Sequence, residues 1–332
     1  MVDPGGHRVN SRHIQIALGI LWLVDGVLQM QPFMFSRGFA TKVIAPAAAG
    51  QPSWVAWPVH QAASVIGSHP VALDAVFAFV QLGLGIGFLW PRAVRMAVVG
   101  SVAWAAGIWF VGEGLGGLAG GSASMLTGAP GAASLYAVLA LAAWPRPPGR
   151  FGVTYRSSAG GVAEWFPLAW AAIWFDLALL ALLPANRSAS TVAGQIDGSV
   201  AQVPGWLGRI DHLAATGVHA VGGPMVVFLA VFPAAVGLLA LGTSRQRSFA
   251  AWFGITLALV TWVIGQNFGF LASGTATDPN TGPLLVLSGV ALLGVRTSRR
   301  WAALFGSRAV GSVPPVGALE GFAVEATYVV LT

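Results

Sequence analysis

Two carboxylates lie inside long apolar runs of the sequence, where an ionisable side chain is unexpected. Asp25 falls near the middle of the run 14–35, and Asp176 falls near the middle of the run 165–184. A charged group inside a bilayer costs several kcal/mol unless it is protonated, paired or bound to a cation, and neither run contains Lys or Arg. The two acids therefore predict either a solute site or proton relay, or a neutral polar clasp between helices.

A histidine recurs in each half of the chain, in the segments WVAWPVHQAASVIG and GWLGRIDHLAATGVHAVG. His60 and His212 occupy matching places, and Asp211 precedes His212. Imidazole can bind haem iron, copper or zinc, so one hypothesis is a metal site formed by these three residues. The other is that the rings pack beside Trp at the membrane interface. The sequence has no HExxH motif and no cysteine, so it contains no clustered ligand motif.

Two glycine-rich segments share one spacing: GLGGLAGGSAS (114–124) and NFGFLASGTAT (267–277). Their glycines permit left-handed backbone, and the hydroxyls of Ser122 and Thr275 could contact an anion or line an entrance. A tight hairpin explains the pattern equally well, and no Gly-Lys-Ser/Thr follows, which excludes a phosphate loop. Glu113 and Gln266 precede the two segments at equivalent positions. Gln81 is a further candidate, because it is a polar residue within an apolar run.

The composition indicates a polytopic membrane protein. Of the 332 residues, 56% are hydrophobic and 8% are charged, whereas soluble domains have about 25% charged residues. A soluble enzyme is therefore excluded. The absence of cysteine also excludes disulfides, thiolate metal sites and thiol chemistry.

The apolar runs predict eight membrane-spanning helices. A cytoplasmic N-terminus places 13 of the 17 basic residues on the inner side and 4 on the outer side, so we expect both termini in the cytoplasm of a bacterial-type plasma membrane. This asymmetry explains the net charge of +6, so nucleic-acid binding is not needed to explain it. The expected spans are 14–35, 71–90, 93–112, 130–145, 165–184, 223–242, 249–267 and 282–296.

The chain is predicted to be an internal duplication. A shift of 153 residues aligns 109–130 with 262–283 without a gap, and a shift of 152 aligns Trp22 with Trp174 and His60 with His212. We therefore expect an all-α fold of two parallel four-helix repeats related by a pseudo-twofold axis along the membrane normal. The expected parts are a first repeat (1–150), a cytoplasmic linker (151–164), a second repeat (165–300) and a cytoplasmic tail (301–332).

Each half also resembles a known family. The segments LGILWLVDGVLQMQPFMFSRGFA, FVQLGLGIGFLWPRAVRMAVVGSVAWAAGIWF and SLYAVLALAAWPRPPGRFGV are similar to the DoxX/DoxD group of four-helix membrane proteins. The resemblance covers most of each half and implies a link to membrane redox systems, such as the membrane subunits of a thiosulfate:quinone oxidoreductase. This chain departs from the group in being a tandem fusion, and no catalytic residue is carried across.

The sequence leaves two classes of function open. The first is an accessory subunit of a respiratory or redox assembly, not catalytic alone, that binds lipid, quinone or a partner protein. Haem, copper or quinone are its candidate cofactors, and its partners would be the bilayer, other membrane subunits or a second copy of the chain. The alternative is a transporter or channel for a small solute or ion that uses Asp25 and Asp176.

Overall fold

The computed structural model describes residues 9–145, 161–198, 200 and 203–295, and every regular element in these ranges is helical. The longer elements of the first half are α1 (Ser11–Leu28), α3 (Ser53–Ser68), α4 (Pro70–Leu89), α5 (Val94–Gly107) and α6 (Ala132–Ala142), with the three-residue α2 (Arg37–Phe39) after α1. Those of the second half are α7 (Phe166–Ala181), α8 (Ala189–Asp197), α9 (Gly205–Val221), α10 (Gly223–Ala240), α11 (Ser244–Val263) and α12 (Thr281–Gly294).

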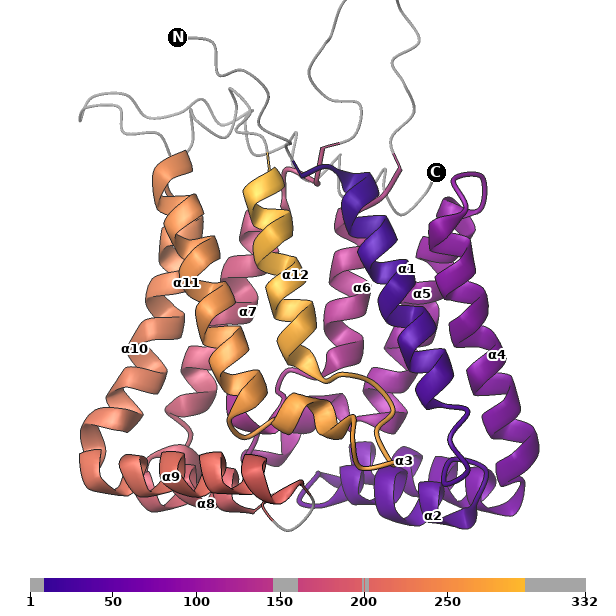
Figure 1. Cartoon of the computed structure of the whole chain (residues 1–332), viewed down its shortest axis with the longest axis horizontal. Helices are drawn as coiled ribbons and strands as arrows, with labels where there is room; N and C mark the ends of the chain where they lie inside the picture. The colour runs from indigo at the N-terminus through magenta and orange to yellow at the C-terminus, as the bar shows by residue number, and fades with distance from the viewer. Residues whose placement is uncertain (1–8, 146–160, 199, 201–202, 296–332) are drawn as a thin grey trace, which may run out of the picture.

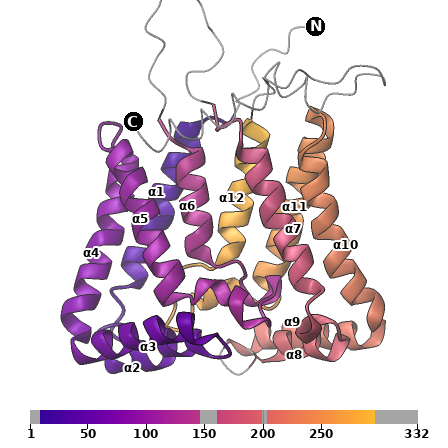
Figure 2. The same ribbon diagram turned by 180° about the vertical axis from the view of Figure 1, so that it is seen from behind.

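The helices form an upright bundle with a transverse layer at one end (Figures 1 and 2). Helices α1, α4, α5 and α6 stand beside α7, α10, α11 and α12, while α2, α3, α8 and α9 lie across the end of the bundle. The transverse α3 and α9 contain the two segments that carry the matched histidines. Their Trp54, Trp57 and Trp206 are exposed, as expected for helices anchored at a membrane interface.

Four helices are long and apolar enough to cross a membrane: Ser11–Leu28, Pro70–Leu89, Val94–Gly112 and Gly223–Ala240. They indicate a membrane protein. A helix overlaps each of the other four predicted spans, although α6, α7 and α12 have fewer than 18 residues and α11 begins at Ser244, five residues before its span. The first helix ends at Leu28 and not near residue 35, because the chain turns after it towards α2.

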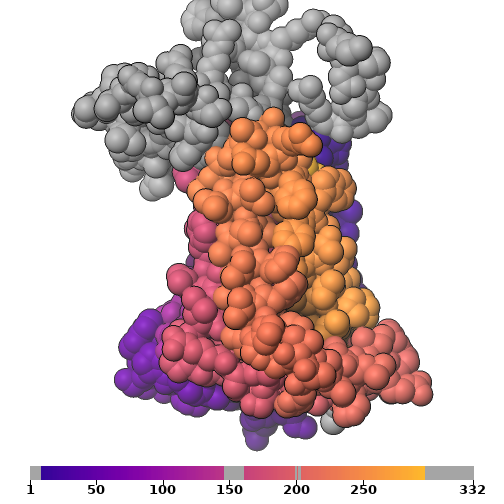
Figure 3. Space-filling view, turned by 90° about the vertical axis from the view of Figure 1, so that its left-hand side faces the viewer, coloured from indigo at the N-terminus to yellow at the C-terminus, as the bar shows by residue number. Residues whose placement is uncertain are grey.

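Large apolar side chains cover the outside of the bundle. Phe79 on α4 is 78% exposed and Met96 on α5 is 76% exposed. Helices α10 and α11, which face the viewer in Figure 3, expose Leu238, Phe249 and Trp252. Such a surface suits hydrocarbon and not water.

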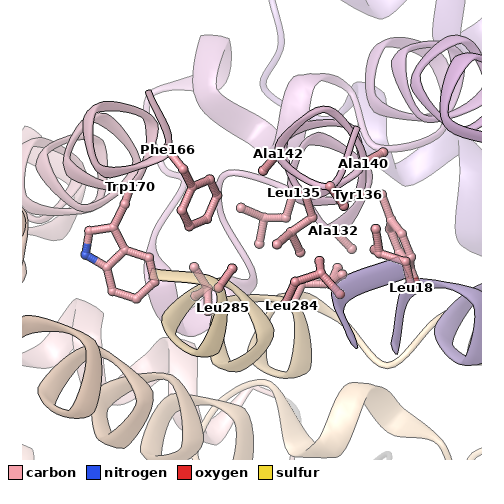
Figure 4. Packing of buried hydrophobic residues seen from close by; sticks show 14 of the residues in the cluster. Leu18, Ala132, Leu135, Tyr136, Ala140, Ala142, Phe166, Trp170, Leu284 and Leu285 are labelled. Atoms are coloured by element: carbon pink, nitrogen blue, oxygen red, sulfur yellow. The ribbon is translucent and has the colours of Figure 1, made fainter. Parts of the chain in front are cut away.

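One hydrophobic core joins the two halves. In Figure 4, Leu135 and Tyr136 of α6 lie close to Leu284 and Leu285 of α12, and Phe166 and Trp170 of α7 adjoin them. All six residues belong to one buried cluster. The predicted tail (301–332) and most of the predicted linker (151–164) lie outside the described residues.

Candidate functional site

A cavity of about 430 Å³ lies within the first half of the molecule. This volume is in the range of small-molecule sites, and the walls are mainly apolar. Three of the predicted residues, Asp25, Gln81 and Glu113, line it together. The other elements that contribute are α2, α3, α5, α6, the short helical segments Ala40–Ile44 and Ile108–Gly112, and the loop before α12. The lining residues include Trp22, Asp25, Gln29, Phe39, Phe77, Gln81, Trp104, Glu113, Tyr136, Thr277 and Asp278.

Five buried polar atoms on the cavity wall have no hydrogen-bond partner. They are Oδ1 of Asp25, Oε1 of Gln81, Nε1 of Trp104, Oε2 of Glu113 and the hydroxyl of Tyr136. Each unsatisfied buried polar group costs about 1–3 kcal/mol. The five side chains come from five different helices or turns and all line one cavity, which makes this cavity the candidate binding site.

Asp25 is fixed at the centre of this wall by the packing of α1. Its side chain is 2% exposed, and the phenol of Tyr136 on α6 lies against its carboxyl. One turn earlier, Trp22 donates from Nε1 to Oγ of Ser101 at 3.0 Å and stacks on Tyr136 with ring centroids 4.2 Å apart. Helices α1, α5 and α6 are thereby held together around the acid.

Glu113 has one oxygen in a structural role and one buried oxygen without a hydrogen-bond partner. It follows the wide helical turn at Ile108–Gly112, and its Oε1 accepts from the N–H of Ala133 at 3.0 Å, which caps the start of α6. Its Oε2 lies so close to Gly131 that a Cβ there would be 2.2 Å away. Burial, together with the nearby Asp278, raises the pKa of Glu113 to about 8, although the Ala133 bond opposes this.

The third acid of the cavity, Asp278, comes from the second half. Its oxygens accept from Thr277 Oγ1 at 2.8 Å and from the N–H of Asn280 at 2.7 Å. Gln31 of the first half holds the same loop by donating to the carbonyl of Ala276 at 2.9 Å. Burial raises the pKa of Asp278. The cavity is therefore completed by a loop that crosses between the halves.

The two glycine-rich segments contain the same unusual backbone. Residues 114–117 have φ values of 54°, 59°, 63° and 78°, and residues 267–270 have φ values of 51°, 54°, 67° and 55°. Each segment is thus a short left-handed turn, which costs L-residues such as Leu115 and Phe268 about 1–2 kcal/mol each. The turn bends the chain sharply beside the cavity in the first half.

Matching hydrogen bonds follow the two turns and correct the predicted register. Trp109 donates from Nε1 to the carbonyl of Pro130, and Trp262 donates to that of Pro279, both at 2.7 Å. The ungapped alignment of Pro130 with Pro283 is therefore wrong beyond the turns, because the second loop is four residues shorter. Glu113 and Gln266 remain equivalent, since Gln266 Oε1 accepts from the N–H of Gly282 at 3.1 Å at the start of α12.

Asp25 and Asp176 are not equivalent. A Cβ at Gly85 would meet Gly19 and Leu23, and a Cβ at Gly237 would meet Ala171 and Phe175, which gives a constant shift of 152 residues. At this shift the counterpart of Asp25 is Leu177, which is 2% exposed. Asp176 corresponds instead to Val24, is partly exposed, and does not line the cavity.

The corresponding place in the second half is nearly filled. Its cavity has a volume of about 20 Å³. Leu177, Ala181 and Leu229 line it, at the positions of Asp25, Gln29 and Phe77. By the same correspondences, Pro233 stands for Gln81, Leu257 for Trp104 and Leu285 for Tyr136. The polar residues on the helices are therefore specific to the first half, and Thr277 and Asp278 of the second half complete the site.

The other polar candidates lie outside the cavity. Gln266 is 1% exposed and engages both ends of its amide, because Nε2 also donates to the carbonyl of Met125 at 2.9 Å. Ser122 is exposed. Thr275 bonds Ser273 within its own loop. These three residues have local roles in the loops that connect the halves.

The predicted metal-binding residues are separated. His60 on α3 and His212 on α9 are both exposed, and these helices lie under different halves of the bundle (Figure 1). His212 Nδ1 is 3.5 Å from Asp197 Oδ1. Asp211 is buried and accepts from the N–H of Gly265 at 3.3 Å. Within the described residues, no group of three or more His, Asp or Glu is arranged to hold a metal ion.

No family model, curated protein or solved structure matches this chain. The likeness to the DoxX/DoxD group consequently stays a prediction, and function has to be inferred from the site itself.

Sequence reasoning missed Trp104, Tyr136 and Asp278. Neither Trp104 nor Tyr136 belongs to a motif, since both lie in apolar runs. Comparison of the halves could have found Trp104, which Leu257 replaces, but not Tyr136, because the ungapped register pairs Tyr136 with Gly289 and not with Leu285. Asp278 carries no such signal, since only the folded loop brings it to the other half.

Proposed function

We propose that this protein is a multi-pass membrane protein that binds a small amphipathic solute in the first-half cavity, as the solute site of a transporter. The observation that supports this is the set of five unpartnered polar atoms in a cavity with apolar walls. The acids proposed to contact the solute are Asp25 and Glu113, and Asp176 lies outside the cavity.

The proposed topology has eight crossings, with both termini in the cytoplasm of a bacterial-type plasma membrane and the halves related by a pseudo-twofold axis. It is supported by the helix that overlaps each predicted run and by the paired contacts of Gly85 and Gly237. The basic-residue asymmetry supports the orientation. Transporters built from parallel repeats bind their substrates between such helices.

The test is to identify what the purified protein carries. Protein taken from its own membranes into nanodiscs would be extracted with solvent, and the released small molecules would be compared by mass spectrometry with those of variants. We expect a stoichiometric compound in the natural protein and in Asp176→Asn, and its loss in the double variant Asp25→Asn, Glu113→Gln. The same lipids in all three samples would contradict the proposal.

Transport is then measured directly. The identified compound would be loaded into proteoliposomes that contain the natural protein, Asp25→Asn or Asp176→Asn. We expect flux with the first and third proteins and a reduction of at least tenfold with Asp25→Asn. Equal flux for Asp25→Asn and the natural protein would exclude Asp25 from the path.

A second candidate is the accessory subunit of a membrane redox assembly. The observation that favours it is that Trp104, whose Nε1 has no hydrogen-bond partner, and Tyr136 both line the cavity, since N–H and O–H donors suit the carbonyl oxygens of a quinone. It predicts a quinone among the released molecules and further subunits, or a second copy, in native mass spectra. A different released compound from a protein without partners would favour the transporter.

A further inference from the structure

We propose that the solute is an organic cation, namely an amine with an apolar body whose ammonium group lies between Asp25 and Glu113. This inference rests on the proposed function, because it concerns the same cavity. It adds the charge and the chemical class of the solute.

The cavity wall has acids and no bases. Asp25, Glu113 and Asp278 line it, and none of the described lining residues is Arg, Lys or His. The nearest basic side chain along α1, Arg12, is at the opposite end of that helix, where it donates to the carbonyls of Phe88 and Leu89. Lys42 is exposed. Three acids that interact with one another electrostatically therefore have no cation beside them among the described residues of the cavity wall.

The unpartnered atoms are mainly hydrogen-bond acceptors. The side chains of Asp25, Gln81 and Glu113 come from three separate elements and line one cavity, and each has a buried oxygen without a hydrogen-bond partner. An ammonium group has three N–H donors and no acceptor. One such group can donate to these oxygens, and its positive charge favours the ionised form of Glu113, which burial otherwise disfavours.

Aromatic rings provide the rest of a cation site. The rings of Trp22 and Tyr136 form one pair, and Phe77 meets Trp104 edge to face with centroids 5.6 Å apart. All four rings line the cavity. Aromatic faces attract desolvated cations, and they also accommodate an apolar body. An inorganic cation has no apolar body that these aromatic walls could contact.

The second half shows that the polar set is not required for folding. Leu177, Pro233, Leu257 and Leu285 stand at the positions of Asp25, Gln81, Trp104 and Tyr136, and the helices around them pack in the same pairs. The cavity there is closed to about 20 Å³. The acids of the first half cost stability that a leucine would not, so their presence is explained by what they bind.

The test compares two probes of the same shape and different charge. Tritiated phenylbutylamine, which is cationic near neutral pH, and its neutral analogue phenylbutanol would be bound to the full chain in nanodiscs. Empty nanodiscs would correct for partition into lipid. We expect the amine to bind at least tenfold more tightly than the alcohol.

The variants separate binding from folding. Glu113→Gln keeps the cap on α6, because Gln266 makes the same bond in the second half. We expect Glu113→Gln and Asp25→Asn each to weaken the amine at least tenfold and to leave the alcohol within twofold. Asp176→Asn, the same change outside the cavity, should leave both probes within twofold.

The outcomes distinguish the two proposals. If the alcohol binds as tightly as the amine, or if neither cavity variant weakens the amine, the cation inference is overturned while solute binding stands. If neither probe binds above the empty nanodisc and the purified protein carries no compound that the double variant loses, both proposals are overturned.

Discussion

At the scale of single residues, Asp25 and Leu177 form a natural comparison, because one backbone arrangement holds an acid in the first half and an apolar residue in the second. Asp25 Oδ1 is buried without a partner, whereas Leu177 fills its site. Such an unpaired acid costs the folded state about 1–3 kcal/mol.

Replacing the acid by its counterpart should therefore stabilise the protein. Asp25→Leu is expected to raise the midpoint of thermal unfolding in detergent and to abolish amine binding. The reverse change, Leu177→Asp, should lower the midpoint, because it buries an acid where the cavity has room for about one water only. A lower midpoint for Asp25→Leu would show that Asp25 supports the fold.

Glu113 predicts a specific dependence of stability on pH. Burial and the nearby Asp278 raise its pKa from 4.5 to about 8, and Asp25 and Tyr136 also face it. Between these two values the folded state holds a proton that the unfolded state has lost. The contribution of Glu113 to stability is therefore complete below pH 4.5 and is lost as the pH rises towards about 8.

Glu113→Gln removes this titration and keeps the bond to Ala133. The difference in unfolding midpoint between the natural protein and Glu113→Gln should therefore move in favour of the variant between about pH 5 and pH 8. Parallel midpoints across that range would mean that Glu113 is ionised in the folded protein.

At the scale of elements, the left-handed turns are the most constrained part of the site. Gly116 has φ of 63°, and a Cβ there would be 2.1 Å from the carbonyl oxygen of Pro130. Gly121 has φ of 75° and open space around it. A side chain at Gly116 would therefore add a steric clash to the backbone strain, whereas a side chain at Gly121 would add backbone strain alone.

We expect Gly116→Ala to reduce stability by more than about 3 kcal/mol, because the clash with backbone adds to the strain of the turn. Gly121→Ala should cost only about 1–2 kcal/mol. Thermal midpoints in detergent measure both. Equal losses would mean that the loop moves to admit the methyl group.

The elements also show how far sequence reasoning reached. Hydropathy predicted a helix in each apolar run, and a helix overlaps every one of them. The repeat predicted that Glu113 and Gln266 are equivalent, and both side chains accept a backbone N–H at the start of the following helix, α6 or α12. Sequence reasoning failed at Pro130, because the first loop has four more residues than the second and the ungapped alignment did not allow for them. It also failed where a contact depends on the folded loops, as at Asp278, since no local pattern encodes a neighbour from the other half.

At the scale of the whole molecule, the halves are interlocked by their loops. Asp278 and Thr277 of the second half line the first-half cavity. In the opposite direction, Ser124 donates to Gln195 at 2.8 Å, and Asn186 donates to the carbonyl of Ala123 at 2.8 Å. The shared core of α6, α7 and α12 adds to this (Figure 4).

Because each half contributes a loop to the other, we expect solute binding to need both halves, although most polar residues of the cavity lie in the first half. Residues 1–150 alone would expose the faces of α1 and α6 that meet α12 and would lack Asp278, so we expect no specific amine binding. Co-expression with residues 151–332 should restore an assembly that copurifies and binds the amine within about threefold of the natural chain, because the core re-forms without the link. Binding of equal affinity by residues 1–150 alone would show that the crossing loop and Asp278 contribute nothing to the site.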